Sequence, residues 1–291
     1  MNLGEALNDA SSRLRDADID DARLEAELLL RHSLGITREE LYKRLQEPLE
    51  PKSEQDYESL TTRRLAHEPA AYIIGHREFC GFEFACSPAA LIPRPETELV
   101  VETAIDWIKR RKPPVEELRA IDVGTGGGAI AVALAKQVPR LRIVATDVSA
   151  DALALARRNA TAQCVSERLE FVEGSLLEPV RGAFDLVIAN LPYIPSRTYN
   201  TLPPEIHDHE PEVALRAGRR GTVVIEELLQ QARGRLSSGG MLLAEHAWNQ
   251  GGALRRVAAD HFPTAEIETR RDLAGHERML LVTALASKRG P

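Results

Sequence analysis

The sequence predicts an α/β protein whose mostly parallel sheet is covered by helices on both faces. Three observations lead to this prediction. From residue 118 onward, short apolar runs alternate with segments whose apolar residues recur at helical spacing. A glycine-rich loop separates the first apolar run from the first helical segment. The 291 residues are 43% hydrophobic and 28% charged, which fits a globular chain of two domains at about 150 residues each.

We expect residues 1–70 to form a small N-terminal helical domain, because apolar residues recur there at helical spacing. Thr37 and Glu40 form a capping box that opens a short helix, and Pro51 opens another that continues to His67. No catalytic motif falls in this part of the chain. We therefore interpret it as a structural or substrate-recognition domain.

Residues 71–94 are predicted to form a β-hairpin linker between the two domains. Residues 72–74 and 79–84 alternate in the manner of strands, with a glycine at a bend. After the linker, Pro95 and Glu96 open a helix, since proline suits the first helical turn and an acid suits its positive end.

The larger domain is expected at residues 95–286, followed by a disordered tail at 287–291. Its strands are predicted at residues 118–123, 141–146, 169–172, 184–189, 241–245, 265–268 and 279–282. Its helices are predicted at residues 128–136, 150–162, 223–236 and 252–259. This alternation is typical of a parallel sheet covered by helices.

Composition limits the classes of function. Lysine and arginine number 37 against 44 acidic residues, a net charge of −7, which argues against nucleic-acid binding through overall charge. The cysteines, Cys80, Cys86 and Cys164, form no C-x-x-C pair, so we expect a reduced, cytoplasmic compartment. We find no secretory signal, and the apolar run at 129–135 is far shorter than the ~18 residues of a membrane span.

The loop at residues 122–128, Asp-Val-Gly-Thr-Gly-Gly-Gly, lies at the carboxyl end of the predicted sheet, where ligands of open α/β folds bind. Asp147 ends the second strand, 19 residues after Gly128, where an acid can accept hydrogen bonds from both hydroxyls of a ribose. The spacing fits both the G-x-G-x-x-[GA] pattern of dinucleotide-binding proteins and the G-x-G-x-G loop of S-adenosylmethionine-dependent methyltransferases. The loop alone leaves both cofactors open. A P-loop is excluded because no Gly-Lys-[Ser/Thr] follows.

The tetrapeptide Asn-Leu-Pro-Tyr at residues 190–193 favours a methyltransferase. It follows the fourth predicted strand and is therefore expected beside the glycine loop. Methylating a planar nitrogen requires acceptors for its N–H groups, and the Asn190 side-chain oxygen and the Leu191 backbone carbonyl can supply them. Pro192 fixes the turn, and the Tyr193 ring can stack on the planar group. A sulfonium donor is already activated, so a strong general base is not required.

Motifs along nearly the whole chain closely resemble the release-factor glutamine N5-methyltransferases, the PrmC or HemK family. The motifs are Glu68-Pro69-x-x-Tyr72-Ile73-x-Gly75-x-x-x-Phe79, Leu91-Ile92-Pro93-Arg94-Pro95-Glu96-Thr97-Glu98, Asp122-Val123-Gly124-Thr125-Gly126, Asn190-Leu191-Pro192-Tyr193-Ile194, Glu210-Pro211-x-x-Ala214-Leu215, Glu245-His246-x-Trp248-x-Gln250-Gly251 and Asp272-x-x-Gly275-x-x-Arg278. The resemblance implies a helical N-terminal domain, a β-hairpin linker and a class I, Rossmann-like methyltransferase sheet. It also implies methyl transfer from S-adenosylmethionine to the glutamine side-chain amide in the Gly-Gly-Gln motif of class I peptide release factors.

The resemblance assigns roles to particular residues. The residues expected to bind the cofactor are Thr97, Gly124, Thr125, Gly126, Gly127, Gly128, Asp147, Ser175, Leu176 and Asn190. The glycine loop would line the methionine part and Asp147 the ribose. The residues expected to bind and align the glutamine are Asn190, Leu191, Pro192 and Tyr193, with Arg94 of the linker near the site. We expect no metal, no membrane and no direct nucleic-acid partner.

Three parts of the sequence depart from the family pattern: Leu191, the neighbouring pair Ser175 and Leu176, and residues 216–220. Leu191 replaces the first proline of Asn-Pro-Pro-Tyr, which leaves the backbone carbonyl but predicts a less rigid loop. Ser175 stands where the family has an acid, so a contact to the adenine amino group would be weaker. Leu176 supplies apolar packing where relatives offer an aromatic. The basic residues at 216–220 are expected in a solvated loop, with a contact to ribosomal RNA or the release factor as the alternative.

Four other functions remain to be weighed. Adenine N6-methyltransferases of RNA or DNA share Asn-x-Pro-Tyr, but they lack the segment at 91–98 and this N-terminal module. Ribosomal-protein glutamine methyltransferases differ at residues 94–97. A nicotinamide-dependent reductase would need a catalytic tyrosine–lysine pair or a histidine, which we do not find. A non-catalytic binding module would predict a tolerated Asn190→Ala substitution.

Two groups of polar residues are interpreted as structural. His207, His209 and Glu210 lie close together, but their spacing fits no common zinc motif. Glu245 and His246 are expected to form a satisfied structural pair at a strand end.

Overall fold

The computed structural model describes residues 1–111 and 117–285, so residue 286 and the predicted tail at 287–291 lie outside the described residues. Contacts divide the chain into two compact units. The N-terminal unit combines Met1–His76 with Pro203–His209, and the C-terminal unit comprises Arg77–Leu202 and the chain from Glu210 onward. We describe each unit by itself.

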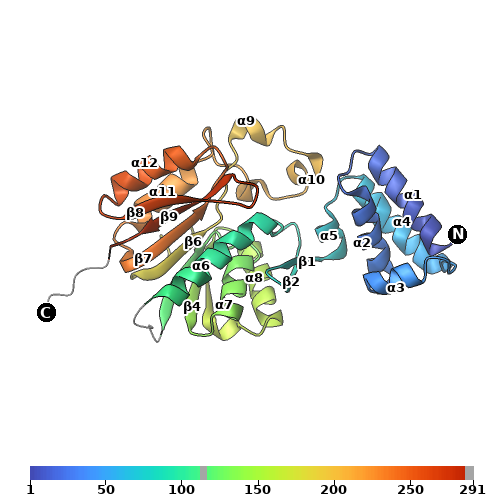
Figure 1. Ribbon diagram of the computed structural model, residues 1–291, viewed down its shortest axis with the longest axis horizontal. Coiled ribbons are helices and arrows are strands. Elements are labelled where there is room, and N and C mark those ends of the chain that lie inside the picture. The colour runs from blue at the N-terminus through green and yellow to red at the C-terminus, as the bar shows by residue number, and fades with distance from the viewer. Residues whose placement is uncertain (112–116, 286–291) are drawn as a thin grey trace. The chain divides into compact units, whose positions relative to one another are not determined.

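The N-terminal unit is helical (Figure 1). Its elements are α1 (Leu3–Asp16), α2 (Ala22–Leu34), α3 (Arg38–Lys43), α4 (Pro51–Leu65), α5 (Ala70–Ile74) and, from the distant segment, α10 (Pro204–His207). The apolar faces of the first helices bury a core that includes Leu7, Leu14, Leu29, Leu30 and Leu41. The predicted capping box of Thr37 and Glu40 is confirmed, and α3 begins directly after it.

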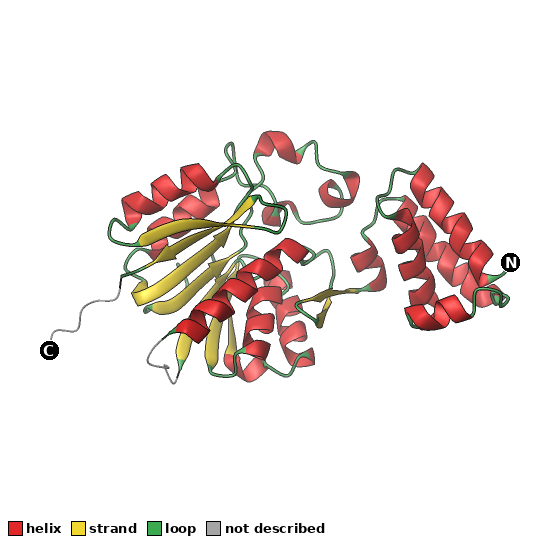
Figure 2. Cartoon of the chain, in the orientation of Figure 1, coloured by secondary structure: helices red, strands yellow, loops and turns green. Residues whose placement is uncertain are grey.

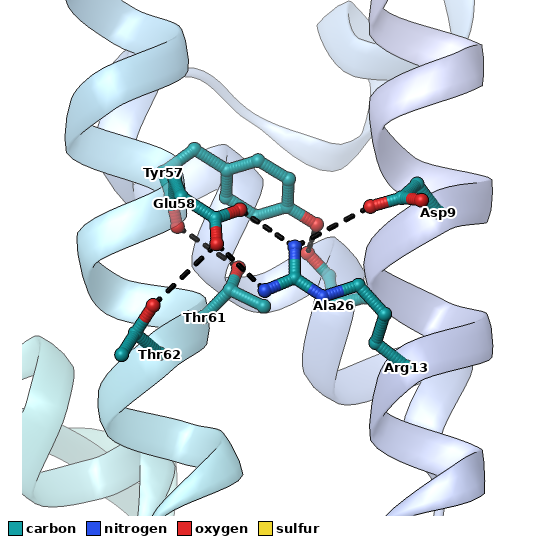
Figure 3. Close-up of polar contacts among 7 residues, drawn as sticks. All are labelled: Asp9, Arg13, Ala26, Tyr57, Glu58, Thr61 and Thr62. Atoms are coloured by element: carbon teal, nitrogen blue, oxygen red, sulfur yellow. Dashed lines mark hydrogen bonds and ion pairs between the residues drawn. The ribbon is translucent and has the colours of Figure 1, made fainter.

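Polar contacts also join the helices of this unit (Figure 3). Two hydrogen bonds of 2.6 Å connect the Arg13 guanidinium on α1 to the Glu58 carboxylate on α4. The buried Tyr57 hydroxyl donates to the backbone oxygen of Ala26 on α2 at 3.0 Å. These contacts fix α4 against both α1 and α2.

The short helix α10 is held by Arg64, whose side chain is buried on α4. The guanidinium donates to Glu205 of α10 at 2.6 Å and to Glu25 of α2 at 3.0 Å. Two acidic partners compensate the burial of this charge, because a buried cation is costly unless it is paired and hydrogen-bonded.

The linker departs from the prediction at its start. Residues 72–74 were expected in a strand, but they form the last part of α5. Pro69 precedes the helix, and Gly75, with φ +82, ends it in a left-handed conformation that favours glycine. The predicted hairpin over 79–84 is confirmed: β1 (His76–Phe79) and β2 (Phe82–Ala85) flank a tight turn.

The C-terminal unit contains a seven-stranded sheet in the order β5-β4-β3-β6-β7-β9-β8 (Figure 2). Its strands are β3 (Leu118–Val123), β4 (Leu141–Asp147), β5 (Leu169–Glu173), β6 (Phe184–Ala189), β7 (Leu236–Glu245), β8 (Glu266–Arg271) and β9 (Glu277–Thr283). The pairs from β5 to β7 are parallel, and β9 is antiparallel to both of its neighbours. The predicted mostly parallel sheet is confirmed.

Helices cover both faces of this sheet (Figure 1). On one face lie α6 (Glu98–Arg110), α7 (Ala129–Gln137) and α8 (Ala150–Ala162), and on the other lie α11 (Val223–Ala232) and α12 (Gly251–His261). Each face has its own apolar core. Shorter helical turns lie in the loops: η1 (Pro95–Thr97), η2 (Ser166–Arg168), α9 (Ser196–Tyr199) and η3 (Glu212–Ala214). In the described part of the chain, no helix has the length and apolarity to span a membrane.

One predicted boundary is wrong. The helix expected over 223–236 ends at Ala232, and β7 already begins at Leu236 rather than at 241. Gly234, with φ +78, reverses the chain after the helix, and Leu236 pairs with Phe184 before the register shifts. After Leu236 the next four residues of β7 are serine and glycine, so the sequence pattern does not show that the strand begins there.

Candidate active site

The strand order reverses between β3 and β6, and a cavity of about 360 Å³ lies there at the carboxyl ends of the strands. This volume falls within the range of ~300–1,000 Å³ typical of small-molecule sites. The predicted residues that line it are Arg94, Thr97, Gly124, Thr125, Gly126, Gly127, Asp147, Ser175, Leu176, Asn190, Leu191 and Pro192.

Two predicted site residues do not line this cavity. Gly128 is the N-cap of α7 with φ +81, and a Cβ added there would lie 3.0 Å from the Cβ of Ala156. Its place in the structure therefore allows α7 and α8 to approach closely. Tyr193 is half-buried, and its hydroxyl donates to Glu245.

The glycine loop is folded back on the end of β4. The N–H groups of Gly124 and Thr125 both donate to the carbonyl oxygen of Thr146, at 2.8 and 2.9 Å. Gly124 has φ +70, and a Cβ added there would lie 2.7 Å from a methyl carbon of Leu191. Glycine is thus needed at position 124 for two reasons: the backbone there has a positive φ, and the Leu191 side chain leaves no room for a Cβ.

Asp147 organises the neighbouring backbone. One carboxylate oxygen accepts from the N–H of Gly126 at 2.8 Å, and the other accepts from the N–H of Ser149 at 2.9 Å. Each carboxylate oxygen has more than one acceptor position, so Asp147 retains capacity for the hydroxyls of a ligand. Ser175 and Leu176 line the same part of the cavity.

Asp122 lies fully buried beneath the loop and was not among the predicted site residues. It accepts hydrogen bonds from the Thr125 hydroxyl at 2.7 Å and from the N–H of Ala131 at 3.1 Å. Burial raises the pKa of this carboxyl to about 6. The signal in the sequence was an acid in the mostly apolar strand, one residue before its end and two residues before the first glycine of the loop.

A chain of hydrogen bonds connects the tetrapeptide to η1 and to β7. The Asn190 side-chain nitrogen donates to the Thr97 hydroxyl at 3.0 Å, and that hydroxyl donates to a carboxylate oxygen of Glu245 at 2.8 Å. The Tyr193 hydroxyl donates to the other carboxylate oxygen at 3.2 Å. Burial raises the pKa of Glu245 to about 6.

The predicted pair of Glu245 and His246 is therefore wrong. Successive side chains of a strand point to opposite faces, which separates the two groups. The Glu245 carboxylate contacts Thr97 and Tyr193, whereas the His246 ring nitrogen Nδ1 lies 2.8 Å from the carbonyl oxygen of Ala247. Sequence reasoning missed Glu245 as part of the site.

Arg94 is held beside the cavity by Glu210. The buried Glu210 carboxylate pairs with the Arg94 guanidinium and also accepts from the backbone N–H of Ile92 at 3.2 Å. Glu210 thus fixes the linker. Within residues 1–111 and 117–285, no three histidine, cysteine or acidic side chains are grouped to hold a metal ion.

Comparison with known proteins agrees with this architecture. The family described as the PrmC N-terminal domain matches residues 5–75, and the family described as the methyltransferase small domain matches residues 108–202. Among solved structures, the hMettl16 catalytic domain is similar in fold with a TM-score of 0.58 at 15% sequence identity. That similarity covers 76% of this chain and 83% of the other. The fold and the site define a class I, Rossmann-like methyltransferase.

Curated relatives narrow this class to one family. The release factor glutamine methyltransferase of Bordetella pertussis is 40% identical to this chain, over 88% of this chain and 93% of the relative. The protein of the same name from Moorella thermoacetica is 38% identical, over 97% of this chain and 98% of the relative. The chain belongs to the release factor glutamine methyltransferase family.

Proposed function

We propose that this chain transfers a methyl group from S-adenosylmethionine to the side-chain amide nitrogen, N5, of the glutamine in the Gly-Gly-Gln motif of class I peptide chain release factors. One observation carries the proposal beyond family membership. Asn190 and Leu191 line the same cavity as the glycine loop, with the Leu191 side chain directly over Gly124. A planar amide held by the tetrapeptide would therefore lie next to a cofactor on the loop.

The size of the cavity and its hydrogen-bonding groups support S-adenosylmethionine as the ligand. The backbone of Gly124 lines the cavity, and the Asp147 carboxylate stands at the end of β4, where it could accept from ribose hydroxyls. Thr125, Gly126 and Gly127 would hold the methionine part. When bound, S-adenosylmethionine supplies an activated methyl group on a sulfonium.

Ser175 and Leu176 would hold the base. Both line the cavity next to the end of β5, as Asp147 does next to the end of β4. Ser175 can accept from an adenine amino group, although a neutral hydroxyl is a weaker partner than a carboxylate. Leu176 adds an apolar surface to the cavity, and it belongs to the apolar core on the face of the sheet that α11 and α12 cover.

The acceptor amide would be aligned by the tetrapeptide. The Asn190 side-chain oxygen would accept one N–H of the glutamine amide, and the Leu191 backbone carbonyl would accept the other. Pro192 restricts the backbone that follows these acceptors. The Tyr193 ring, which the sequence predicts to stack on the amide plane, does not line the cavity, and its hydroxyl donates to Glu245 instead. Alignment of this kind lowers the barrier through proximity, and the acceptors stabilise positive charge that develops on nitrogen.

The partner would be a protein that presents a glutamine on an accessible loop. A cytoplasmic location fits this partner and the free state of the three cysteines, Cys80, Cys86 and Cys164.

Peptide mass spectrometry tests the proposal. A recombinant class I release factor is incubated with the protein and S-adenosylmethionine, and the peptide that carries Gly-Gly-Gln is analysed. We expect one added methyl group on the glutamine, lost with Asn190→Ala and retained with Asn200→Ala, an exposed asparagine elsewhere in the unit. A release factor with alanine in place of the glutamine should stay unmodified. If the factor is unmodified while S-adenosylmethionine still binds, the acceptor is wrong, and ribosomal proteins and RNA are tested next.

A further inference from the structure

The hydrogen-bond chain from Asn190 to Glu245 has only one consistent direction. A hydroxyl carries a single hydrogen, so it donates once and otherwise accepts. The Thr97 hydroxyl lies 2.8 Å from a Glu245 carboxylate oxygen, and an ionised carboxylate only accepts. The hydrogen of Thr97 is therefore committed to Glu245, and toward Asn190 the hydroxyl offers a lone pair.

This direction determines how the Asn190 amide is turned. Its nitrogen must face Thr97, at the observed 3.0 Å, and its oxygen must lie on the opposite edge of the amide group. A half-turn of the amide would place its oxygen against the lone pair of Thr97. The edge that carries the oxygen is the one that can accept an N–H from an acceptor amide in the cavity.

We propose that Glu245 is a positioning residue that acts through Thr97 to hold the Asn190 amide with its oxygen toward the methyl acceptor. This inference rests on the proposed function, because it assigns the orientation of the group that would bind the glutamine amide. Glu245 itself does not line the cavity, and it acts without touching the acceptor.

The surroundings of Glu245 fit this role. Its exposed fraction is 3%, and an apolar side chain would avoid the cost of burying a carboxylate there. The carboxylate accepts from the hydroxyls of Thr97 and Tyr193, one at each oxygen, so its orientation is fixed. Tyr193 is thereby bound to the same carboxylate that Asn190 reaches through Thr97.

The register of the sheet brings the members together. Ala189 of β6 pairs in parallel with Ala244 of β7, so Asn190, directly after β6, and Glu245, the last residue of β7, lie at two adjacent strand ends. Thr97 comes from η1, where its side chain is also almost fully buried. The turn η1, which follows the linker, therefore contributes the hydroxyl that joins the two strand ends.

The pKa of the Glu245 carboxyl depends on a small number of neighbouring groups. Burial and the nearby Glu96 raise its pKa, while the hydroxyls of Thr97 and Tyr193 and the charge of Arg278 lower it, with a net value of about 6. Below that pH the carboxyl gains a hydrogen and can donate to Thr97. Thr97 would then be free to donate toward Asn190, and the amide orientation would no longer be fixed.

The first test compares steady-state methylation by matched variants at pH 8. Glu245→Gln keeps the size of the side chain but adds a donor, and we expect kcat to fall at least about tenfold. We expect the KM for the release factor and the Kd for S-adenosylmethionine to stay within about twofold, since neither ligand touches Glu245. Glu268→Gln, at an exposed position on β8, is the control and should match the wild type.

Thr97 variants distinguish orientation from a general structural role. Thr97→Val removes the hydroxyl at nearly constant size and should reduce kcat as Glu245→Gln does. Thr97→Ser keeps the hydroxyl and should restore most of the rate. Because both changes break one chain, the double variant Glu245→Gln/Thr97→Val should lose little more than either single variant. Fully additive losses, or a Thr97→Ser variant as slow as Thr97→Val, would overturn the proposal.

The pH dependence supplies a second readout. The ratio of kcat for the wild type to kcat for Glu245→Gln should fall toward one as the pH is lowered through about 6. The ratio cancels the contribution of Asp122, whose pKa lies in the same range in both proteins. A ratio that stays constant from pH 5 to 8 would overturn the proposal.

A third measurement requires no acceptor and separates this inference from the proposed function. The side-chain amide signal of Asn190 in a ¹⁵N-correlated NMR spectrum can be assigned by its loss in Asn190→Asp. We expect this signal to shift in Glu245→Gln and Thr97→Val and to stay in place in Thr97→Ser. An unchanged signal in all of them would refute the orienting role whatever the acceptor is. A shifted signal with no methylation of the release factor would instead refute the acceptor alone.

Discussion

Replacing Gly124 by alanine tests how closely the tetrapeptide is packed on the glycine loop. Two separate costs follow from the structure. The backbone at this position has φ +70, which costs an L-residue roughly 1–2 kcal/mol. The added Cβ would also lie 2.7 Å from a methyl carbon of the buried Leu191, and overpacking of this kind costs about 1–3 kcal/mol. We expect Gly124→Ala to lower the free energy of unfolding by about 2–5 kcal/mol.

A double-mutant cycle separates the two costs. Leu191→Ala alone should destabilise the protein by about 2–5 kcal/mol, as large-to-small changes in a core do. In the double variant the clash is gone. The double variant should therefore lose about 1–3 kcal/mol less than the sum of the losses of the two single variants. The backbone cost of Gly124→Ala should persist.

The assay is urea unfolding followed by circular dichroism, with titration calorimetry for S-adenosylmethionine on the folded variants. Gly234→Ala is the control, because φ there is +78 while no atom lies within 4 Å of the added Cβ. It should show the backbone cost only. Equal losses for Gly124→Ala and Gly234→Ala, or strictly additive losses in the cycle, would refute the packing argument.

Three further predictions concern other parts of the molecule. Tyr57→Phe removes the hydrogen bond to Ala26 and should lower the free energy of unfolding by about 1 kcal/mol in urea titrations; no change would mean that the bond is replaced by water. Burial raises the pKa of Asp122 from 3.8 to about 6, so its ionisation costs stability above that pH and the cost disappears as the pH falls toward 4. The stability of Asp122→Asn relative to the wild type should therefore improve by roughly 2–3 kcal/mol from pH 4 to 8, and the opposite slope in thermal melts would contradict this. Asn159→Ala removes hydrogen bonds to Ala85 and Gly127 and should cost about 2–4 kcal/mol in urea unfolding, whereas a loss under 1 kcal/mol would show that they are dispensable.

The parallel strands were predictable because both of their faces are buried. Runs such as β3 and β6 are nearly all apolar, and the structure gives both the bounds that the sequence predicts. The start of β7 was not predictable. Its first residues are mainly serine and glycine, and regular pairing with β6 resumes only at Met241, after a register shift. The helix at 70–74 was hidden for a different reason. Five residues are too few for a period to be recognised, and capping by Pro69 and Gly75 decides the local structure.

The candidate site was predictable where it is local in sequence. The glycine loop, Asp147 and the tetrapeptide each follow a strand, so their common edge could be inferred. Glu245 was not recognised, because its contact with Thr97 spans 148 residues and its contact with Tyr193 spans 52. The strand register that joins them depends on tertiary pairing. A search for acids within the last two residues of buried strands would have found both Glu245 and Asp122.

The segment Pro203–His209 gives the chain an unusual path between its two units. The polypeptide crosses from one unit to the other after His76, returns to the first with Pro203 and leaves it again after His209. The smaller unit is thus not an appendage on a single tether. A chain shortened to begin at Arg77 would keep α10 but lose Arg64, the partner of Glu205. Dissection of this protein into its two units therefore requires three cuts and new connections, not the removal of one end.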